Sequence, residues 1–117
     1  MDRIVLEGLE FYGYHGVFEE ESKMGARFVV DVVLELDLPE HDNIRQTVDY
    51  SRVYDLVRCE VTEKRYKLIE ALAAQIARAL LASEARVEVV TVRVHKPHAP
   101  LPGVVRDVFV EVRRDRS

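Results

Sequence analysis

Apolar and polar residues alternate along much of this chain, which is the pattern of β-strands with one buried face. The longest regular stretch covers residues 28–38, where every second residue is apolar: Phe28, Val30, Val32, Leu34, Leu36 and Leu38. An earlier strand carries its apolar residues at Ile4, Leu6, Leu9 and Phe11. The alternation changes face across Gly8, and this change predicts a β-bulge at the glycine.

Two amphipathic helices are predicted after the second strand. The first follows from apolar residues at helical spacing, Val53, Leu56, Val57 and Val61, with Ser51 as its N-cap. The second has a stronger apolar face, made of Ile69, Leu72, Ala73, Ile76, Ala77, Leu80 and Leu81. Residues 39–50 precede the helices without either periodicity, and connections of that length in compact domains are often functional.

Strands return after Ser83. The apolar positions change parity between Val89 and Val90, which predicts a second bulge, and a last strand is predicted from Val104 to Arg113. The order β-β-α-α-β-β predicts one α+β domain over residues 1–117, with a four-stranded antiparallel sheet and two helices on one face. The other face mixes valines with charges, and the sheet has two open edges, so we expect self-association.

The composition is that of an ordinary soluble globular protein, with 32% charged and 48% hydrophobic residues. The net charge of −4 argues against a nucleic-acid or acidic-membrane partner. The single cysteine, Cys59, excludes an internal disulfide and fits a reducing compartment. Because the chain shows neither a signal-peptide pattern nor an apolar run of about 18 residues, we expect a cytoplasmic protein without a membrane span.

Lys96 ends a strand of alternating valines and stands directly before a proline-rich turn. Period-two geometry puts its side chain on the same face as Val90, Val92 and Val94. The chain has four lysines and thirteen arginines, and a lysine kept at this place suits a task that needs an amine able to lose its proton. A strand-end lysine that only reaches water is the alternative interpretation.

Three other segments carry candidate chemistry. Residues 11–16, Phe-Tyr-Gly-Tyr-His-Gly, suit close backbone approach to a planar ligand, or simply a strand end broken by glycine. Tyr50 ends the segment Thr47-Val48-Asp49-Tyr50 before a helix, where it either donates a proton or covers an edge of the core. Glu70 lies in the first turn of the second helix, where its carboxylate is either stabilised by the helix dipole or paired with N–H groups of a ligand.

The remaining charged and metal-binding residue types give weaker signals. The charged run over residues 17–25 is typical of a solvated loop. The four histidines, His15, His41, His95 and His98, together with one cysteine, do not have the spacing of a zinc site. We therefore predict no metal site.

Taken in order, these segments resemble the dihydroneopterin aldolase family of folate biosynthesis. The similarity covers essentially the whole chain and is carried by residues 11–16, Glu21 four residues before Gly25, Thr47–Tyr50, Leu68–Glu70, Lys96-Pro97 and Pro102-Gly103. The family has the T-fold (tunnelling fold), in which subunits join their sheets into a barrel, and bacterial members usually stack two four-subunit rings. The resemblance thus implies a homo-octamer that binds a pterin, without a cofactor and without nucleic-acid or membrane partners.

The family reaction is a retro-aldol cleavage of dihydroneopterin to hydroxymethyl-dihydropterin and glycolaldehyde, without metal or Schiff base. The resemblance implies that Lys96 is the acid–base group near the side-chain hydroxyl, either as a neutral amine in an apolar site or as a charged group acting through water. It implies that Tyr50 helps to reprotonate the intermediate, and that Glu21 lies near the substrate side chain.

The resemblance also implies how the pterin ring is held. Glu70 would anchor its amino and ring N–H groups, with Leu68 and Ile69 beside it. Thr47 and Val48 would meet the ring, while Tyr50 would reach into the pocket of a neighbouring subunit. We therefore expect each site to be shared between subunits.

Two alternatives stay open at this point. One is the related dihydroneopterin triphosphate epimerase, against which the glycine-aromatic run over residues 11–16 argues. Some epimerisation of dihydroneopterin to dihydromonapterin is also expected beside the aldolase reaction. The other alternative is a non-catalytic, oligomeric pterin-binding module, which would keep Glu70 but would not require Lys96 or Tyr50.

Overall fold

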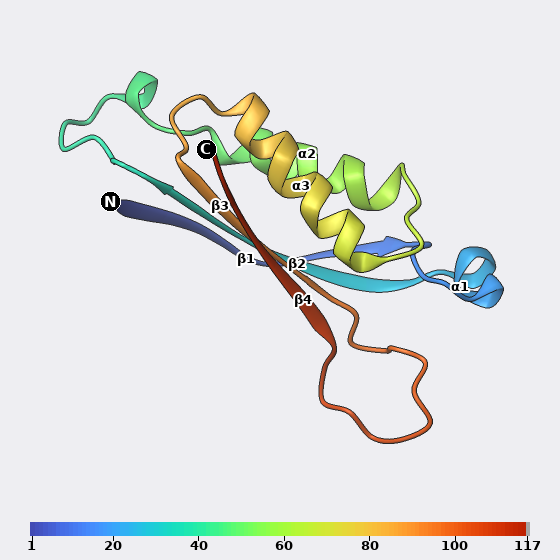
Figure 1. Cartoon of the computed structure of the whole chain (residues 1–117). Coiled ribbons are helices and arrows are strands. Elements are labelled where there is room, and N and C mark those ends of the chain that lie inside the picture. Colours follow the sequence, from blue (N-terminus) through green and yellow to red (C-terminus); the bar gives the residue numbers. More distant parts are fainter. Residues whose placement is uncertain (117) are drawn as a thin grey trace.

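The computed structural model describes residues 1–116 as one antiparallel sheet with helices on one face (Figure 1). The sheet has four strands in the order β1-β2-β3-β4. Their bounds are Asp2–Gly13 for β1, Ala26–Leu36 for β2, Val89–His95 for β3 and Phe109–Asp115 for β4. The predicted α+β class and four-stranded antiparallel sheet are confirmed.

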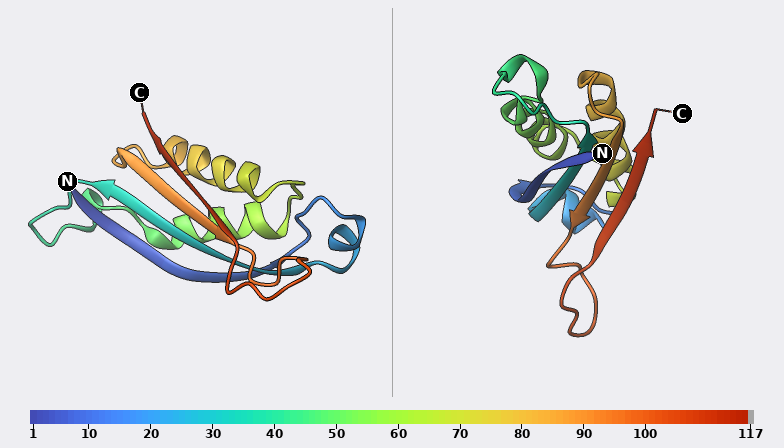
Figure 2. Two further views of the ribbon diagram at one scale, coloured as in Figure 1. Left: turned by 60° about the horizontal axis from the view of Figure 1, so that its bottom comes forward. Right: turned by 90° about the vertical axis from the view of Figure 1, so that its left-hand side faces the viewer.

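Two long helices, α2 (Tyr50–Thr62) and α3 (Ile69–Ser83), cover the same face of the sheet (Figures 1 and 2). Their predicted apolar faces point inward. The residues that they place in the hydrophobic core are Val53, Val57, Val61, Ile69, Leu72, Ala73, Ile76, Ala77, Leu80 and Leu81. Removal of these side chains from water is the main force that fixes both helices on the sheet.

The central strand β2 supplies the other half of this core. Phe28, Val30, Val32, Leu34 and Leu36 are fully buried, while the residues between them are partly exposed. A slip of one residue would turn the whole apolar set to the opposite face. The alternation therefore fixes how β2 pairs with β1 and β3.

The predicted bulge at Gly8 is present. The pairing of β1 with β2 shifts between Leu6 and Leu9, and Gly8 has a φ of 73°, in the left-handed region that favours glycine. Its N–H donates to Asp31 Oδ1 over 2.8 Å. The bulge thus links β1 to a carboxylate on the sheet face that the helices leave open.

The same carboxylate anchors His95, the last residue of β3. His95 Nε2 lies 2.6 Å from Asp31 Oδ2, and Nδ1 lies 2.7 Å from Asp107 Oδ2. Burial lowers the pKa of His95, but the hydrogen bonds to Asp107 and Asp31 outweigh it, so the pKa is raised above its ordinary value. The bridge ties the strand end next to Lys96 to the far end of the loop that leads into β4.

Two predictions about the C-terminal strands are wrong. β3 pairs with β2 in unbroken register, so there is no second bulge, and the parity change arises because Val87 packs into the core from the turn before the strand. β4 begins at Phe109 rather than at Val104. Its partner strand ends at His95, and the chain leaves the sheet at Pro97, which has no N–H to donate.

Three local features differ from the sequence prediction around the helices. The charged run forms a short, solvated helix, α1 (Glu19–Met24), where a loop was predicted. A 3₁₀ turn, η1 (Ile44–Gln46), lies within the segment 39–50. The N-cap of α2 is Asp49 rather than Ser51, because the Asp49 side chain accepts the Ser51 N–H over 3.0 Å.

The sheet face opposite the helices carries exposed apolar residues among charges, as predicted. Val5 is 51% exposed and Phe109 is 49% exposed on this face. The outer strands β1 and β4 present open edges. Both features are typical of a surface that packs against other chains.

Candidate active site

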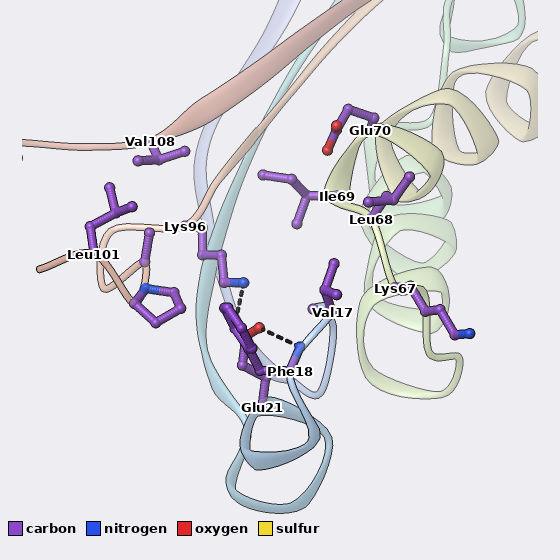
Figure 3. A pocket seen from close by; sticks show the side chains of 13 residues that line it. Val17, Phe18, Glu21, Lys67, Leu68, Ile69, Glu70, Lys96, Leu101 and Val108 are labelled. Atoms are coloured by element: carbon purple, nitrogen blue, oxygen red, sulfur yellow. Dashed lines mark hydrogen bonds and ion pairs between the residues drawn. The ribbon is translucent and has the colours of Figure 1, made fainter.

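A pocket of about 260 Å³ opens where α1, the start of α3 and the loop after β3 meet (Figure 3). Its lining is mostly apolar and includes four charged residues: Glu21, Lys67, Glu70 and Lys96. Lys67 turns outward, whereas the other three face the opening (Figure 3). A concave, largely apolar pocket with a few converging polar groups is the usual form of a small-molecule site.

Lys96 is buried at the edge of this pocket, as the parity of the valine strand predicts, with 9% of its surface exposed. Its backbone N–H donates to the Val108 carbonyl over 2.7 Å, which continues the β3–β4 pairing by one step. Its side chain forms an ion pair with Glu21 (Figure 3).

Glu21 is held by the short helix that carries it. Its Oε1 accepts the Phe18 N–H over 3.2 Å, so the carboxylate that caps α1 also faces Lys96. The carboxylate lies against Gly16, which has a φ of 144° and no side chain. A Cβ at that position would lie 2.3 Å from Glu21 Oε1, so the glycine leaves the room that the carboxylate occupies.

Replacing Gly16 with alanine should therefore displace Glu21 from Lys96. The added Cβ overlaps the carboxylate, and the backbone angle is strained for any residue but glycine. We expect a loss of turnover of about a hundredfold, the usual effect of misplacing a catalytic group by about 1 Å. Gly103→Ala is the matched control, because nothing lies within 4 Å of a Cβ there. Equal kcat values for the two variants would contradict this role of Gly16.

Glu70 faces the same opening from the first turn of α3 (Figure 3). Within residues 1–116, no hydrogen bond or ion pair engages its carboxylate. The exposed Leu68 and the buried Ile69 flank it on the pocket wall. This exposed carboxylate beside an apolar wall suits a planar ligand that presents two adjacent N–H donors.

The segment Thr47–Tyr50 lies elsewhere. It joins η1 to α2 at the end of the sheet that is remote from α1 (Figures 1 and 2). Val48 packs into the core with 3% exposed, and Tyr50 is 65% exposed beside a separate pocket of about 560 Å³. A single chain therefore does not bring Thr47, Val48 and Tyr50 to the pocket of Lys96.

A cluster of buried polar groups behind the pocket was missed from the sequence. His15 is 1% exposed and Glu60 is 5% exposed. Tyr66 donates its hydroxyl to Glu60 Oε1 over 2.7 Å, and Lys64 Nζ lies 2.6 Å from Oε2. Burial, followed by the hydrogen bond to Glu60, raises the pKa of Tyr66 to about 12. The available signal was Glu60 itself, a carboxylate three residues after Val57 on the apolar face of α2.

Among residues 1–116, no group of three or more His, Cys, Asp or Glu side chains is arranged to hold a metal ion. In the same part of the chain, no helix is both long enough and apolar enough to cross a membrane.

Comparison with known proteins bears directly on this arrangement. The family model described as dihydroneopterin aldolase (FolB) matches residues 4–113. The chain belongs to the dihydroneopterin aldolase family. The dihydroneopterin aldolase of Bacillus subtilis (strain 168) is 43% identical over 120 residues, and the match covers 100% of both chains.

Solved structures of dihydroneopterin aldolases share the fold. The E. coli enzyme in complex with neopterin has a TM-score of 0.88 at 25% identity, covering 97% of this chain and 99% of that chain. The Burkholderia thailendensis enzyme bound to guanine has a TM-score of 0.81 at 32% identity, covering 99% of this chain and 92% of that chain. The T-fold expected from the family resemblance is confirmed.

For this member of the dihydroneopterin aldolase family, the fold brings together part of the predicted site. Glu21, Leu68, Ile69, Glu70 and Lys96 all line one pocket. The remaining predicted residues belong to the segment Thr47–Tyr50 at the other end of the molecule (Figure 1). The catalytic and binding roles of all eight residues stay predictions.

Proposed function

We propose that this chain catalyses the retro-aldol cleavage of dihydroneopterin to hydroxymethyl-dihydropterin and glycolaldehyde in folate biosynthesis, as a cytoplasmic enzyme. The observation that carries the proposal is a single pocket in which the free carboxylate of Glu70 faces the largely buried ion pair of Lys96 and Glu21. The carboxylate suits recognition of the ring, and the ion pair suits proton transfer. Membership of the family supports the choice of substrate.

Recognition of the ring would rest on Glu70. Its two oxygens would accept the amino group and the adjacent ring N–H of the pterin, in two charge-assisted hydrogen bonds. Related enzymes bound to neopterin and to guanine support this pairing, because both ligands carry an amino group next to a ring N–H. Leu68 and Ile69 would pack against the ring from the same wall.

The chemistry then requires two proton movements. The hydroxyl on the departing carbon loses its proton to the Lys96–Glu21 pair, directly or through an ordered water. The carbon–carbon bond breaks, the departing carbon becomes the aldehyde of glycolaldehyde, and the electron pair moves into the ring imine. The resulting enamine is protonated on its exocyclic carbon with the help of Tyr50. Because the substrate supplies its own electron sink, neither a metal nor a Schiff base is needed.

Tyr50 enters this scheme from a second subunit. The chain places Thr47–Tyr50 far from Lys96, while β1 and β4 offer open edges and the open sheet face is partly apolar. Pairing of these edges between copies would close a barrel and carry the segment of one chain to the pocket of the next. We propose tetrameric rings, stacked in pairs as a homo-octamer.

The proposal is tested by incubating the purified protein with dihydroneopterin and measuring both glycolaldehyde and dihydromonapterin by chromatography. We expect glycolaldehyde to be the main product, with dihydromonapterin as a minor one. Pterin binding without either product would instead support a non-catalytic binding module. Epimerisation of the triphosphate substrate without glycolaldehyde would support the related epimerase.

A further inference from the structure

Two loops that are far apart in the sequence form facing walls of the pocket. Residues 14–18 follow β1 and lead to Glu21, while residues 63–68 follow α2 and lead to Glu70. The distance between the proton-transfer pair and the ring-binding carboxylate therefore depends on how these loops are joined. The contacts between the two loops are centred on the buried side chain of His15.

Both ring nitrogens of His15 form hydrogen bonds with backbone groups of α2 and of the loop after it. Nε2 lies 2.8 Å from the Val61 carbonyl, and Nδ1 lies 3.0 Å from the Tyr66 N–H. An amide N–H needs an acceptor, so Nδ1 is unprotonated and Nε2 carries the proton that it donates to Val61. The contacts thus select one tautomer of a neutral imidazole.

Three more hydrogen bonds join the same two loops. The Gly16 N–H donates to the Tyr66 carbonyl over 3.0 Å. Arg65 donates to the Tyr14 carbonyl over 3.1 Å and to the Gly16 carbonyl over 3.0 Å. The Tyr66 ring also stacks on His15, with the ring centroids 5.8 Å apart. We name this set of contacts among His15, Gly16, Arg65 and Tyr66 the loop latch.

We propose that His15 is a positioning residue for the pterin site, and that it acts through the loop latch by holding the Glu70 wall at a fixed distance from Lys96 and Glu21. The inference rests on the proposed function for the identity of the ligand. His15 does not line the pocket, so it takes no part in the chemistry itself. Of its two bonds, the one to Tyr66 reaches the loop over residues 63–68, whereas the one to Val61 reaches the helix α2.

Acid should open the loop latch, since a proton on Nδ1 would face the Tyr66 N–H. Burial lowers the pKa of His15, the charges of Arg65 and Lys96 lower it further, and only the Val61 carbonyl opposes them. The other charges near the latch are Glu60, which accepts the Tyr66 hydroxyl, and Lys64, which pairs with Glu60. The stabilisation is therefore complete above the ordinary value of 6.5 and is lost as the pH falls through the lowered value.

Two substitutions of His15 separate its hydrogen bond to Tyr66 from its hydrogen bond to Val61. In His15→Asn, the side-chain oxygen takes the place of Nδ1 and keeps the bond to Tyr66. In His15→Gln, the amide nitrogen takes the place of Nε2 and keeps the bond to Val61. Each loses one buried hydrogen bond and should lower the thermal midpoint to a similar extent. Only the glutamine variant leaves the Tyr66 N–H without its acceptor, so we expect that variant to disturb the pocket more.

The measurement is the neopterin Kd of the folded protein, together with hydrogen exchange at the Tyr66 amide. We expect His15→Gln to raise the Kd about tenfold, as for one lost hydrogen bond, and to speed exchange at Tyr66, with a smaller change for His15→Asn. Arg65→Met should raise the Kd without unfolding the chain, because Arg65 is an exposed side chain and the change removes two hydrogen bonds of the latch. His41→Asn, at an exposed histidine, is the matched control and should leave the Kd unchanged.

Unchanged Kd values in His15→Gln and Arg65→Met, with only a lower thermal midpoint in the histidine variant, would show a structural histidine and overturn the proposal. Equal effects of asparagine and glutamine would also overturn it. These outcomes are distinct from a failure of the proposed function. A wild-type chain that binds neopterin but releases no glycolaldehyde would refute the aldolase reaction, and the Kd series would still decide the role of His15.

Discussion

Replacing Lys96 with alanine should lower the rate of glycolaldehyde release by about a hundred- to ten-thousand-fold, the usual contribution of a positioned acid–base group. Lys96 is the cation that faces Glu21 in the pocket, and both side chains are largely shielded from water. The neopterin Kd should change much less than kcat, because Glu70 holds the ring in the proposed complex. The measurement is kcat for glycolaldehyde release beside the Kd of each variant.

Lys96→Arg tests whether Lys96 acts by transferring a proton or only through its positive charge. Arginine keeps the positive charge and the ability to pair with Glu21, but it does not give up its proton in proteins. If proton transfer is the task of Lys96, the arginine variant should be nearly as slow as the alanine variant. Lys23→Ala, which breaks the exposed ion pair with Glu19 on α1, is the matched control and should keep full activity. Near-normal turnover of Lys96→Arg would contradict a proton-transfer role.

The buried face of each early strand was predictable because it depends on the alternation of apolar and polar residues within that strand. β2 needs only its own sequence to decide which face is buried, and Gly8 marks the bulge by interrupting that alternation. The last strand was placed too early because pairing depends on a partner. Val104 and Val105 look like strand residues, yet β3 has already ended and offers them no hydrogen bonds.

The position of a site residue was predictable only where the geometry of its own strand or helix determines that position. The parity of Lys96 and the first-turn position of Glu70 both follow from their own segments. The pairing of Lys96 with Glu21 needs the fold, because the two are far apart in the chain. The role of His15 is less visible still, since its partners are the backbone groups of Val61 and Tyr66, which any residue presents.

Because Tyr50 and Lys96 lie far apart within one chain, we expect variants at these two residues to complement each other when their subunits are mixed. Each predicted site would take Lys96 and Glu70 from one subunit and Tyr50 from its neighbour, so a site would need one intact half from each. Lys96→Ala destroys the first half and leaves Tyr50 in place. Tyr50→Phe removes the phenol and leaves the pocket of Lys96 in place. Each pure variant should therefore be nearly inactive.

Mixing the two variants should restore activity. When equal amounts are unfolded and reassembled together, about one quarter of the sites in a random cyclic assembly pair an intact Lys96 half with an intact Tyr50 half. We expect glycolaldehyde release at roughly that fraction of the wild-type rate. The control is the same mixture combined without unfolding, which should stay inactive while subunits do not exchange. If both halves had to come from one chain, reassembled mixtures would remain as slow as the pure variants, and Tyr50 could not act across an interface.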